Sequence, residues 1–305
     1  MAYRLERDES VIAGLKRVVR EEMDSADEHL SGKKKVRRDK AIHESRKSIK
    51  KVRALLRLVS EELGDVWKRE NARLRDIARR LSDFRDAFAM IATFDDLKKT
   101  YKKERAGQFA SVRAGLVTRR RQSSHEEDVA LVLNEAVSSL RNASKRVKSW
   151  PLHTDGYGAI GPGLHLTYRT GRKALARVQK DPQALNYHEL RKRVKDHWYH
   201  MRLLEDLWTG VMVAYEKSLK DLETWLGDDH NLAVLRDRVV AEPSFYGADR
   251  DVERFLDLVD KRQKELRDRS VSLAARVYEE KPRDFDRRMR HLWDTWHNQP
   301  KIAGE

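Results

Sequence analysis

Apolar residues recur at intervals of three and four along nearly the whole chain, and few Gly or Pro residues interrupt them. This spacing places apolar side chains on one side of an α-helix, and no segment shows the apolar and polar alternation of a strand. The pattern predicts helices at residues 9–30, 41–62, 66–99, 103–121, 124–149, 163–180, 184–208, 211–240, 250–279 and 284–297. The predicted fold class is therefore all-α.

The strongest interruption lies close to the midpoint of the 305-residue chain. Residues 150–163, WPLHTDGYGAIGPG, contain two Pro and four Gly, which is typical of a connection between helical segments. A division there predicts a first repeat at residues 1–149 and a second at residues 164–305. Length alone allows either one large domain or two of ordinary size.

The two halves carry the same motif. HESRKSIK begins at residue 43 and HELRKRVK begins at residue 188, so the two copies are 145 positions apart. The same offset aligns Asp83 with Asp228. The preceding helices also match, with Arg20 aligned to Arg169 at an offset of 149, and the difference falls in the connecting loop. The sequence therefore indicates an internal duplication.

Each copy of the motif predicts a helix with one basic face. Successive residues of a helix turn by about 100°, so positions three, four and seven apart share a side. In the first copy, the residues within roughly a third of the circumference are His43, Arg46, Lys47, Lys50, Arg53 and Arg57. In the second copy they are His188, Arg191, Lys192, Lys195 and Arg202, with Trp198 at the position equivalent to Arg53.

A basic stripe that occurs twice points to an anionic partner. Like charges one turn apart destabilise an isolated helix, so they need compensation. Acidic residues of neighbouring helices could provide it, which is the alternative interpretation. Arg and Lys one turn apart are separated by about 5.4 Å along the helix, a spacing that suits the successive phosphates of a linear polymer.

Charge and composition narrow the class of protein. The net charge of +15 favours a polyanionic partner, but it does not distinguish nucleic acid, membrane, acidic protein and phosphate chain. The chain has no Cys, which removes disulfides and thiolate sites and fits a reducing compartment. No stretch approaches the ~18 apolar residues of a membrane span, and MAYRLERDES lacks the apolar segment of a signal peptide. We expect a soluble, cytoplasmic protein.

The motifs argue against catalysis. The sequence contains no GxxxxGK[ST], HExxH or GxSxG pattern. Neither His43 nor His188 has a second ligand at metal-binding spacing, because Glu44 and Glu189 project about 100° away. We therefore predict no catalytic residue, no metal site and no cofactor. The two histidines are interpreted as phosphate contacts, with a buried histidine bonded to a neighbouring helix as the alternative.

The repeated motifs resemble the CHAD family, the conserved-histidine α-helical domain. The similarity also includes GYGAIGPGLHLTYRTGRKAL and FDRRMRHLWDTW, so it covers nearly the whole chain. It implies two four-helix bundles, related by internal pseudo-symmetry, around a basic central channel that binds inorganic polyphosphate. It also implies an association with polyphosphate granules. The residues that the resemblance places in the channel are His43, Arg46, Lys47, Lys50, His188, Arg191, Lys192 and Lys195, joined by Arg20, Arg169, Arg172 and Lys173.

The sequence departs from the repeat at one corner. His230 and Asn231 stand where the first copy has Arg85 and Asp86, so we do not assign these positions to the site. The E-x-E-x-K motif of the triphosphate tunnel enzymes to which some family members are fused is absent. The chain therefore resembles the binding domain alone.

RNA binding through the phosphate backbone is the main alternative. Proteins that read bases place aromatic, Asn or Gln side chains along the basic face, and here that face is nearly all Arg, Lys and His. A scaffold that docks acidic proteins is a third interpretation, although the Trp residues are expected in the core. The sequence thus favours non-catalytic binding of polyphosphate.

Overall fold

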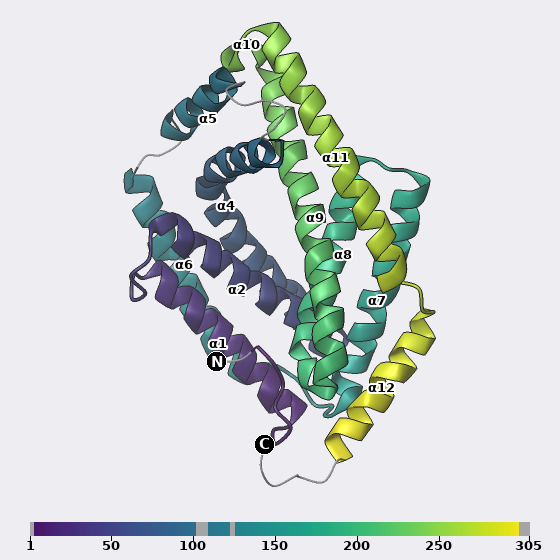
Figure 1. Ribbon diagram of the computed structural model, residues 1–305. Coiled ribbons are helices and arrows are strands. Elements are labelled where there is room, and N and C mark those ends of the chain that lie inside the picture. Colours follow the sequence, from purple (N-terminus) through teal and green to yellow (C-terminus); the bar gives the residue numbers. More distant parts are fainter. Residues whose placement is uncertain (1–2, 102–108, 123–125, 299–305) are drawn as a thin grey trace.

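The computed structural model describes residues 3–101, 109–122 and 126–298, and its ordered elements are helices (Figure 1). The α-helices are α1 (Val11–Leu30), α2 (Arg38–Leu58), α3 (Ser60–Leu63), α4 (Asp65–Thr100), α5 (Ala110–Gln122), α6 (Glu126–Arg146), α7 (Tyr157–Lys180), α8 (Ala184–Leu203), α9 (Thr209–Ala241), α10 (Pro243–Tyr246), α11 (Asp249–Val277) and α12 (Pro282–Asn298). Short 3₁₀ turns follow α6 and α8. The described residues contain no strand, which confirms the all-α prediction.

Most predicted helix ends lie within a few residues of the observed ones. The helix predicted at 66–99, for example, is α4. The helix predicted at 41–62 is instead two helices, because the backbone breaks at Val59 between α2 and α3. The helix predicted to end at 208 ends at Leu203. The predicted starts at residues 103 and 124 lie outside the described residues.

The Gly-rich segment near the midpoint is only partly a connection. Helix α7 begins at Tyr157, six residues before the predicted start, and contains Pro162. Gly163 lies so close to α2 that a Cβ atom built on it would be 1.8 Å from the carbonyl oxygen of Leu58. Only glycine permits this approach. Gly163 therefore reflects tight packing of one helix on another, and only residues 150–156 form an irregular connection.

The duplicated motif occupies matching places in the two halves. Helix α1 packs on α2 and α7 packs on α8, and each pair is followed by a long helix, α4 or α9. The motif helices make equivalent hydrogen bonds to these long helices. Arg53 Nε donates to Asn71 Oδ1 at 2.9 Å, and Trp198 Nε1 donates to Glu216 Oε1 at 3.0 Å. Both pairs are related by the 145-residue offset.

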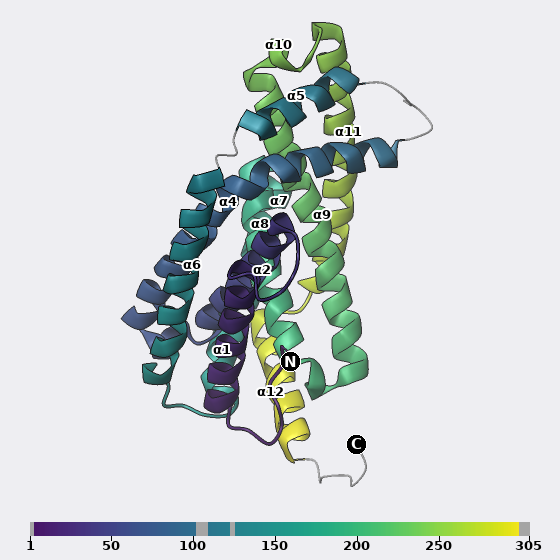
Figure 2. The same cartoon turned by 90° about the vertical axis from the view of Figure 1, so that its left-hand side faces the viewer.

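Two clusters of buried residues form the core. The first joins α1, α2, α7, α8 and α12, and the second joins the later parts of α4 and α9 to α5 and α11. Each cluster contains residues from both halves of the chain. Figures 1 and 2 show α5 and α10 at one end of the molecule and α12 at the other. The motif helices α2 and α8 contact each other within the first cluster, which brings their basic faces together.

In the part of the chain that the structure describes, no helix is long and apolar enough to cross a membrane.

Candidate anion-binding site

A pocket of about 310 Å³ lies between α2 and α8. Helix α2 contributes Arg46, Lys50, Arg53 and Arg57. Helices α8 and α9 contribute His188, Arg191, Lys192, Arg193, Lys195, Asp196, Tyr199 and His230. Among the residues that the structure describes, the lining thus holds eight cationic side chains and one carboxylate. We call this the α2/α8 pocket.

Helical periodicity explains why these residues share one surface. The four basic residues of α2 are spaced by four, three and four positions, which aligns them on one stripe. Ile49, Val52 and Leu56 lie on other sides of the helix and are at most 1% exposed. In α8, Leu190 and Val194 are completely buried in the same way. Burial of these apolar residues fixes the rotation of each helix and directs its basic side toward the pocket.

Contacts between α2 and α8 hold the two sides of the pocket in place. Arg57 forms an ion pair with Asp196, the carboxylate of the lining. His200 is completely buried and its Nε2 donates to the carbonyl oxygen of Ala54 at 2.9 Å. Both contacts join the first half of the chain to the second, so the pocket depends on residues from both halves.

A buried carboxylate on α9 orients the basic residues of α8. Glu223 accepts hydrogen bonds from Lys195 Nζ at 2.6 Å and Lys220 Nζ at 3.0 Å, and Arg191 Nη2 lies 3.8 Å away. Burial opposes ionisation of Glu223, but the charges and hydrogen bonds of the two lysines outweigh it and lower its pKa to about 2. Arg191 also lies against Gly227, where a Cβ would be 3.3 Å from its Nη2.

Two imidazole rings meet at one side of the pocket. The ring centroids of His188 and His230 are 4.5 Å apart, with an interplanar angle of 37°. Burial, then the charges of Lys192 and Arg191, lowers the pKa of His188. Burial, then the charges of Arg191, His188 and Lys50, lowers the pKa of His230 to about 4. Both rings are therefore neutral at pH 7 in the free protein.

The structure brings together about half of the predicted site residues. Those that line the α2/α8 pocket are Arg46, Lys50, Arg53, Arg57, His188, Arg191, Lys192 and Lys195. Those that lie outside its lining are Arg20, His43, Lys47, Arg169, Arg172, Lys173 and Arg202.

Some of the residues outside the lining have local partners. Arg20 Nε donates to the carbonyl oxygen of Lys16 at 3.1 Å, and Lys47 Nζ donates to Glu44 at 2.8 Å. Arg172 Nη1 donates to the carbonyl oxygen of Glu279 at 2.8 Å, close to the end of α11. The sequence shows the charge of such residues, but it cannot show a carbonyl group that approaches from another segment.

The sequence analysis missed four residues of the lining, namely Arg193, Asp196, Tyr199 and His230. Tyr199 falls at about +20° on the wheel that starts at His188, so the periodicity could have revealed it. Arg193 and Asp196 fall at about +140° and +80°, outside the basic sector. His230 comes from another helix, and its only signal was that it interrupts the repeat.

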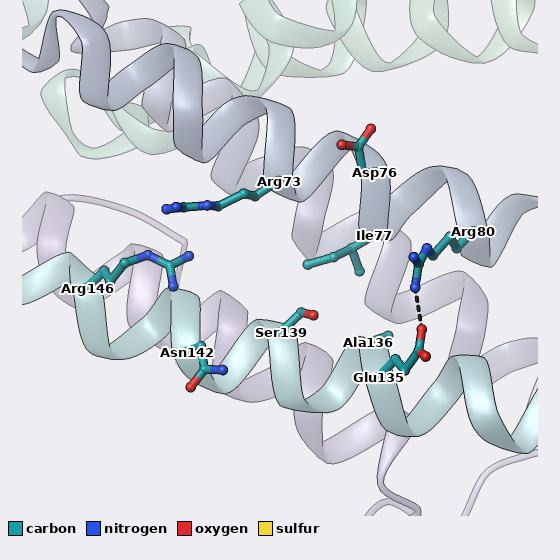
Figure 3. A pocket seen from close by; sticks show the side chains of 9 residues that line it. All are labelled: Arg73, Asp76, Ile77, Arg80, Glu135, Ala136, Ser139, Asn142 and Arg146. Carbon is teal, nitrogen blue, oxygen red and sulfur yellow. Dashed lines mark hydrogen bonds and ion pairs between the residues drawn. The ribbon is translucent and has the colours of Figure 1, made fainter.

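A second arginine-lined pocket, of about 380 Å³, lies between α4 and α6 (Figure 3). We call it the α4/α6 pocket. Its lining includes Arg73, Asp76, Arg80, Glu135, Ser139 and Arg146. Glu70, only 3% exposed, accepts from Arg146 Nε at 2.8 Å and from Arg73 Nη1 at 2.5 Å. Arg80 pairs with Glu135 across the pocket. The arginines of this pocket are therefore balanced by carboxylates.

The described residues of the α2/α8 and α4/α6 pockets do not form a metal site. Among the residues that the structure describes, no group of three or more His, Asp or Glu side chains is arranged to hold a metal ion.

Comparisons with known proteins identify the family of this chain and a solved structure with a similar fold. The CHAD domain family matches residues 18–240, which is more than half of the chain. A crystal structure of the CHAD domain from the plant Ricinus communis is similar to this structure with a TM-score of 0.61. That match covers 95% of both chains at 16% sequence identity, so it shows a shared fold. No curated protein matches the chain. On the family match, the chain belongs to the CHAD domain family.

Proposed function

We propose that this chain binds inorganic polyphosphate in the α2/α8 pocket and does not hydrolyse it. The observation that carries the proposal is the lining of that pocket, where the described residues of both halves of the chain supply eight cationic side chains and one carboxylate. The CHAD family is associated with polyphosphate binding in general, and this chain belongs to that family. A polyanion is the class of ligand that such a concentration of charge attracts.

The arrangement of the cationic side chains in a row favours a linear ligand. From Arg46 to Arg57, α2 rises about 16 Å, so its cations form a row and not a single point. Guanidinium groups can bind phosphate oxygens through two parallel hydrogen bonds, whereas ammonium groups act as point charges. A row that combines Arg and Lys therefore suits a flexible chain of phosphates whose successive units need not adopt one fixed orientation.

We further propose that the two halves are pseudo-symmetric bundles and that the α2/α8 pocket is the middle of a basic channel between them. The equivalent Arg53–Asn71 and Trp198–Glu216 hydrogen bonds support this arrangement. Binding of this kind would bring the protein to cytoplasmic polyphosphate granules. A fluorescent fusion that stays evenly distributed in cells containing such granules would count against that part of the proposal.

The chemistry of the lining favours phosphate over bases. Among the described residues of the lining, Tyr199 is the one aromatic side chain other than histidine, and none is Asn or Gln. A sequence-tolerant RNA site usually offers several aromatic rings for stacking, and a sequence-specific one offers amides for base edges. RNA is therefore the competitor that the experiment has to exclude.

The proposal is tested by isothermal titration calorimetry at near-physiological salt, where weak non-specific attraction is screened. Long-chain polyphosphate is titrated into the protein, with single-stranded RNA of equal charge as the competitor. We expect much tighter binding of polyphosphate, and weaker binding by the Arg46→Ala/Arg191→Ala variant. Equal or tighter binding of RNA would replace this proposal with a nucleic-acid function. Release of orthophosphate from the polymer in the presence of Mg²⁺ would disprove the non-catalytic part.

A further inference from the structure

His188 and His230 lie in contact at one side of the proposed site. Both rings line the α2/α8 pocket, and their centroids are 4.5 Å apart. The Nδ1 atom of His188 is buried and has no hydrogen-bond partner. Two polarisable rings thus face the space that the ligand would occupy, and one of them has unused hydrogen-bonding capacity.

The groups around the two rings are predominantly cationic. Arg191 and Lys192 of α8 and Lys50 of α2 act on them, and Glu189 is the carboxylate that acts on His188. The neighbouring α9 carboxylates Asp228 and Asp229 interact mainly with residues of α11. Asp229 accepts from Gln263 and Arg267 of α11. Arg262 of α11 has the largest charge effect on Asp228, and Asp96, Glu223 and the pocket residue Arg191 also act on it.

We propose that His188 and His230 are proton-dependent contacts for the polyanion, so that binding takes up protons and strengthens as the pH falls. The inference rests on the proposed function, because it concerns the same pocket. It assigns a role to His230, which lies outside the duplicated motif. It also gives the site a regulation that fixed Arg and Lys charges alone cannot provide.

The direction of this pH dependence follows from the cationic groups around the two histidines. In the free protein, burial and the nearby cations hold the pKa of both histidines below the usual value of 6.5. Phosphate oxygens in the pocket would offset the charge of Arg191, Lys192 and Lys50 and would accept a hydrogen bond from each imidazolium. The pKa of each ring therefore rises on binding. Affinity is constant above the bound-state pKa and increases as the pH falls toward the free-state pKa.

Among the described residues, the first half contributes no histidine to the lining of the α2/α8 pocket. His43, the counterpart of His188, lies outside the pocket lining, and its Nε2 is 3.9 Å from Glu44. The position equivalent to His230 is Arg85, a fixed charge. Proton uptake is therefore expected from the second half alone, which makes His43→Gln a matched control for the substitution of His188.

The test is calorimetric titration of the full chain with long-chain polyphosphate at pH 6.5, in two buffers with different ionisation enthalpies. The difference in observed heat gives the number of protons taken up. We expect uptake by the wild type and by His43→Gln, and almost none by His188→Gln/His230→Gln. Affinity of the wild type should rise between pH 7.5 and pH 6, by at most about tenfold per pH unit for each proton taken up. Terminal phosphates release protons on binding a cationic site, so they cannot imitate uptake.

A second variant keeps the inference testable if the double substitution disturbs folding. His230→Arg installs the fixed charge that the first repeat carries, and should bind more tightly at pH 7.5 with a weaker pH dependence. Binding without proton uptake in the wild type, or unchanged uptake in the histidine variants, would overturn the inference alone. Absence of polyphosphate binding at any pH would instead overturn the proposed function, and the inference with it.

Discussion

The α2/α8 pocket and the α4/α6 pocket are similar in size and rich in arginine, yet their charges differ. In the α4/α6 pocket, Arg73 and Arg146 share the buried Glu70, and Arg80 pairs with Glu135 (Figure 3). In the α2/α8 pocket, the described lining holds eight cationic side chains and Asp196. Glu223 and Glu189, outside that lining, pair with Lys195 and Lys192, so the described cations still outnumber the carboxylates. The larger pocket thus has the better balanced charge, at about 380 Å³ against about 310 Å³.

The difference shows how an arginine-rich cavity should be interpreted. Arginine on a helix surface often serves structure, because its planar group can bridge a carboxylate on a neighbouring helix. A binding site for a polyanion needs cationic charge beyond what local carboxylates offset. By that criterion the α2/α8 pocket is a candidate binding site for a polyanion, whereas the arginines of the α4/α6 pocket serve to hold two helices together.

The largest expected effect is on polyphosphate affinity. Arg46→Ala/Arg191→Ala removes one guanidinium from each side of the α2/α8 pocket. Hydrogen bonds to charged groups contribute about 1.5–3 kcal/mol each, so the two substitutions should weaken binding by at least about 100-fold. The slope of log affinity against log salt concentration should also become shallower, because fewer ions are released. Calorimetry over a salt series measures both. An unchanged slope would show that these arginines do not contact the ligand.

The next effect is on stability, and it belongs to the α4/α6 pocket. Glu70→Gln removes the buried charge that holds Arg73 and Arg146, and should lower the free energy of unfolding by about 1–3 kcal/mol. Polyphosphate affinity should stay the same. Urea unfolding, followed by circular dichroism, measures the first quantity. A loss of affinity in a variant that remains folded would show that the two pockets are coupled.

The same variant has a predictable pH dependence. Burial opposes ionisation of Glu70, but the hydrogen bonds and charges of Arg146 and Arg73 outweigh it, so the pKa of this carboxyl is lowered. Such a group adds stability that is complete above its unfolded pKa of about 4.3 and is lost as the pH falls through its folded pKa. The stability difference between wild type and Glu70→Gln should therefore be constant near pH 7 and decrease below about pH 4.3. A difference that grows in acid would contradict the assignment.

A smaller change should strengthen binding. Asp196→Asn keeps the shape of the side chain but removes the one carboxylate of the α2/α8 lining and releases Arg57 toward the ligand. We expect affinity for polyphosphate to increase several-fold, on the order of 1 kcal/mol. Unfolding should become easier, since Arg57–Asp196 joins α2 to α8. Weaker binding by the folded variant would mean that Asp196 orients Arg57 for the ligand and does not compete with it.

The sequence predicted more of the fold than of the site, for physical reasons. Apolar spacing located α4 almost completely, because the core requires one buried stripe along each helix. It failed at the start of α7, where Gly163 permits contact with Leu58, because glycine in a loop and glycine at a helix contact look the same in sequence. Both basic stripes were visible. The sequence did not reveal that His230 approaches the pocket, because the packing of α8 against α9 cannot be predicted from the pattern of either helix alone.

The smallest expected effect is the one that tests the comparison most directly. Arg73→Ala/Arg80→Ala removes the same net charge as Arg46→Ala/Arg191→Ala, so long-range attraction for a polyanion falls comparably in both variants. Because Arg73 and Arg80 are about half exposed and paired with carboxylates, their loss should cost little stability and change polyphosphate affinity by less than about twofold. Calorimetry on the two variants at one salt concentration then separates local contact from net charge. Equal losses of affinity would mean that overall charge alone attracts the ligand, and the distinction between the pockets would fail.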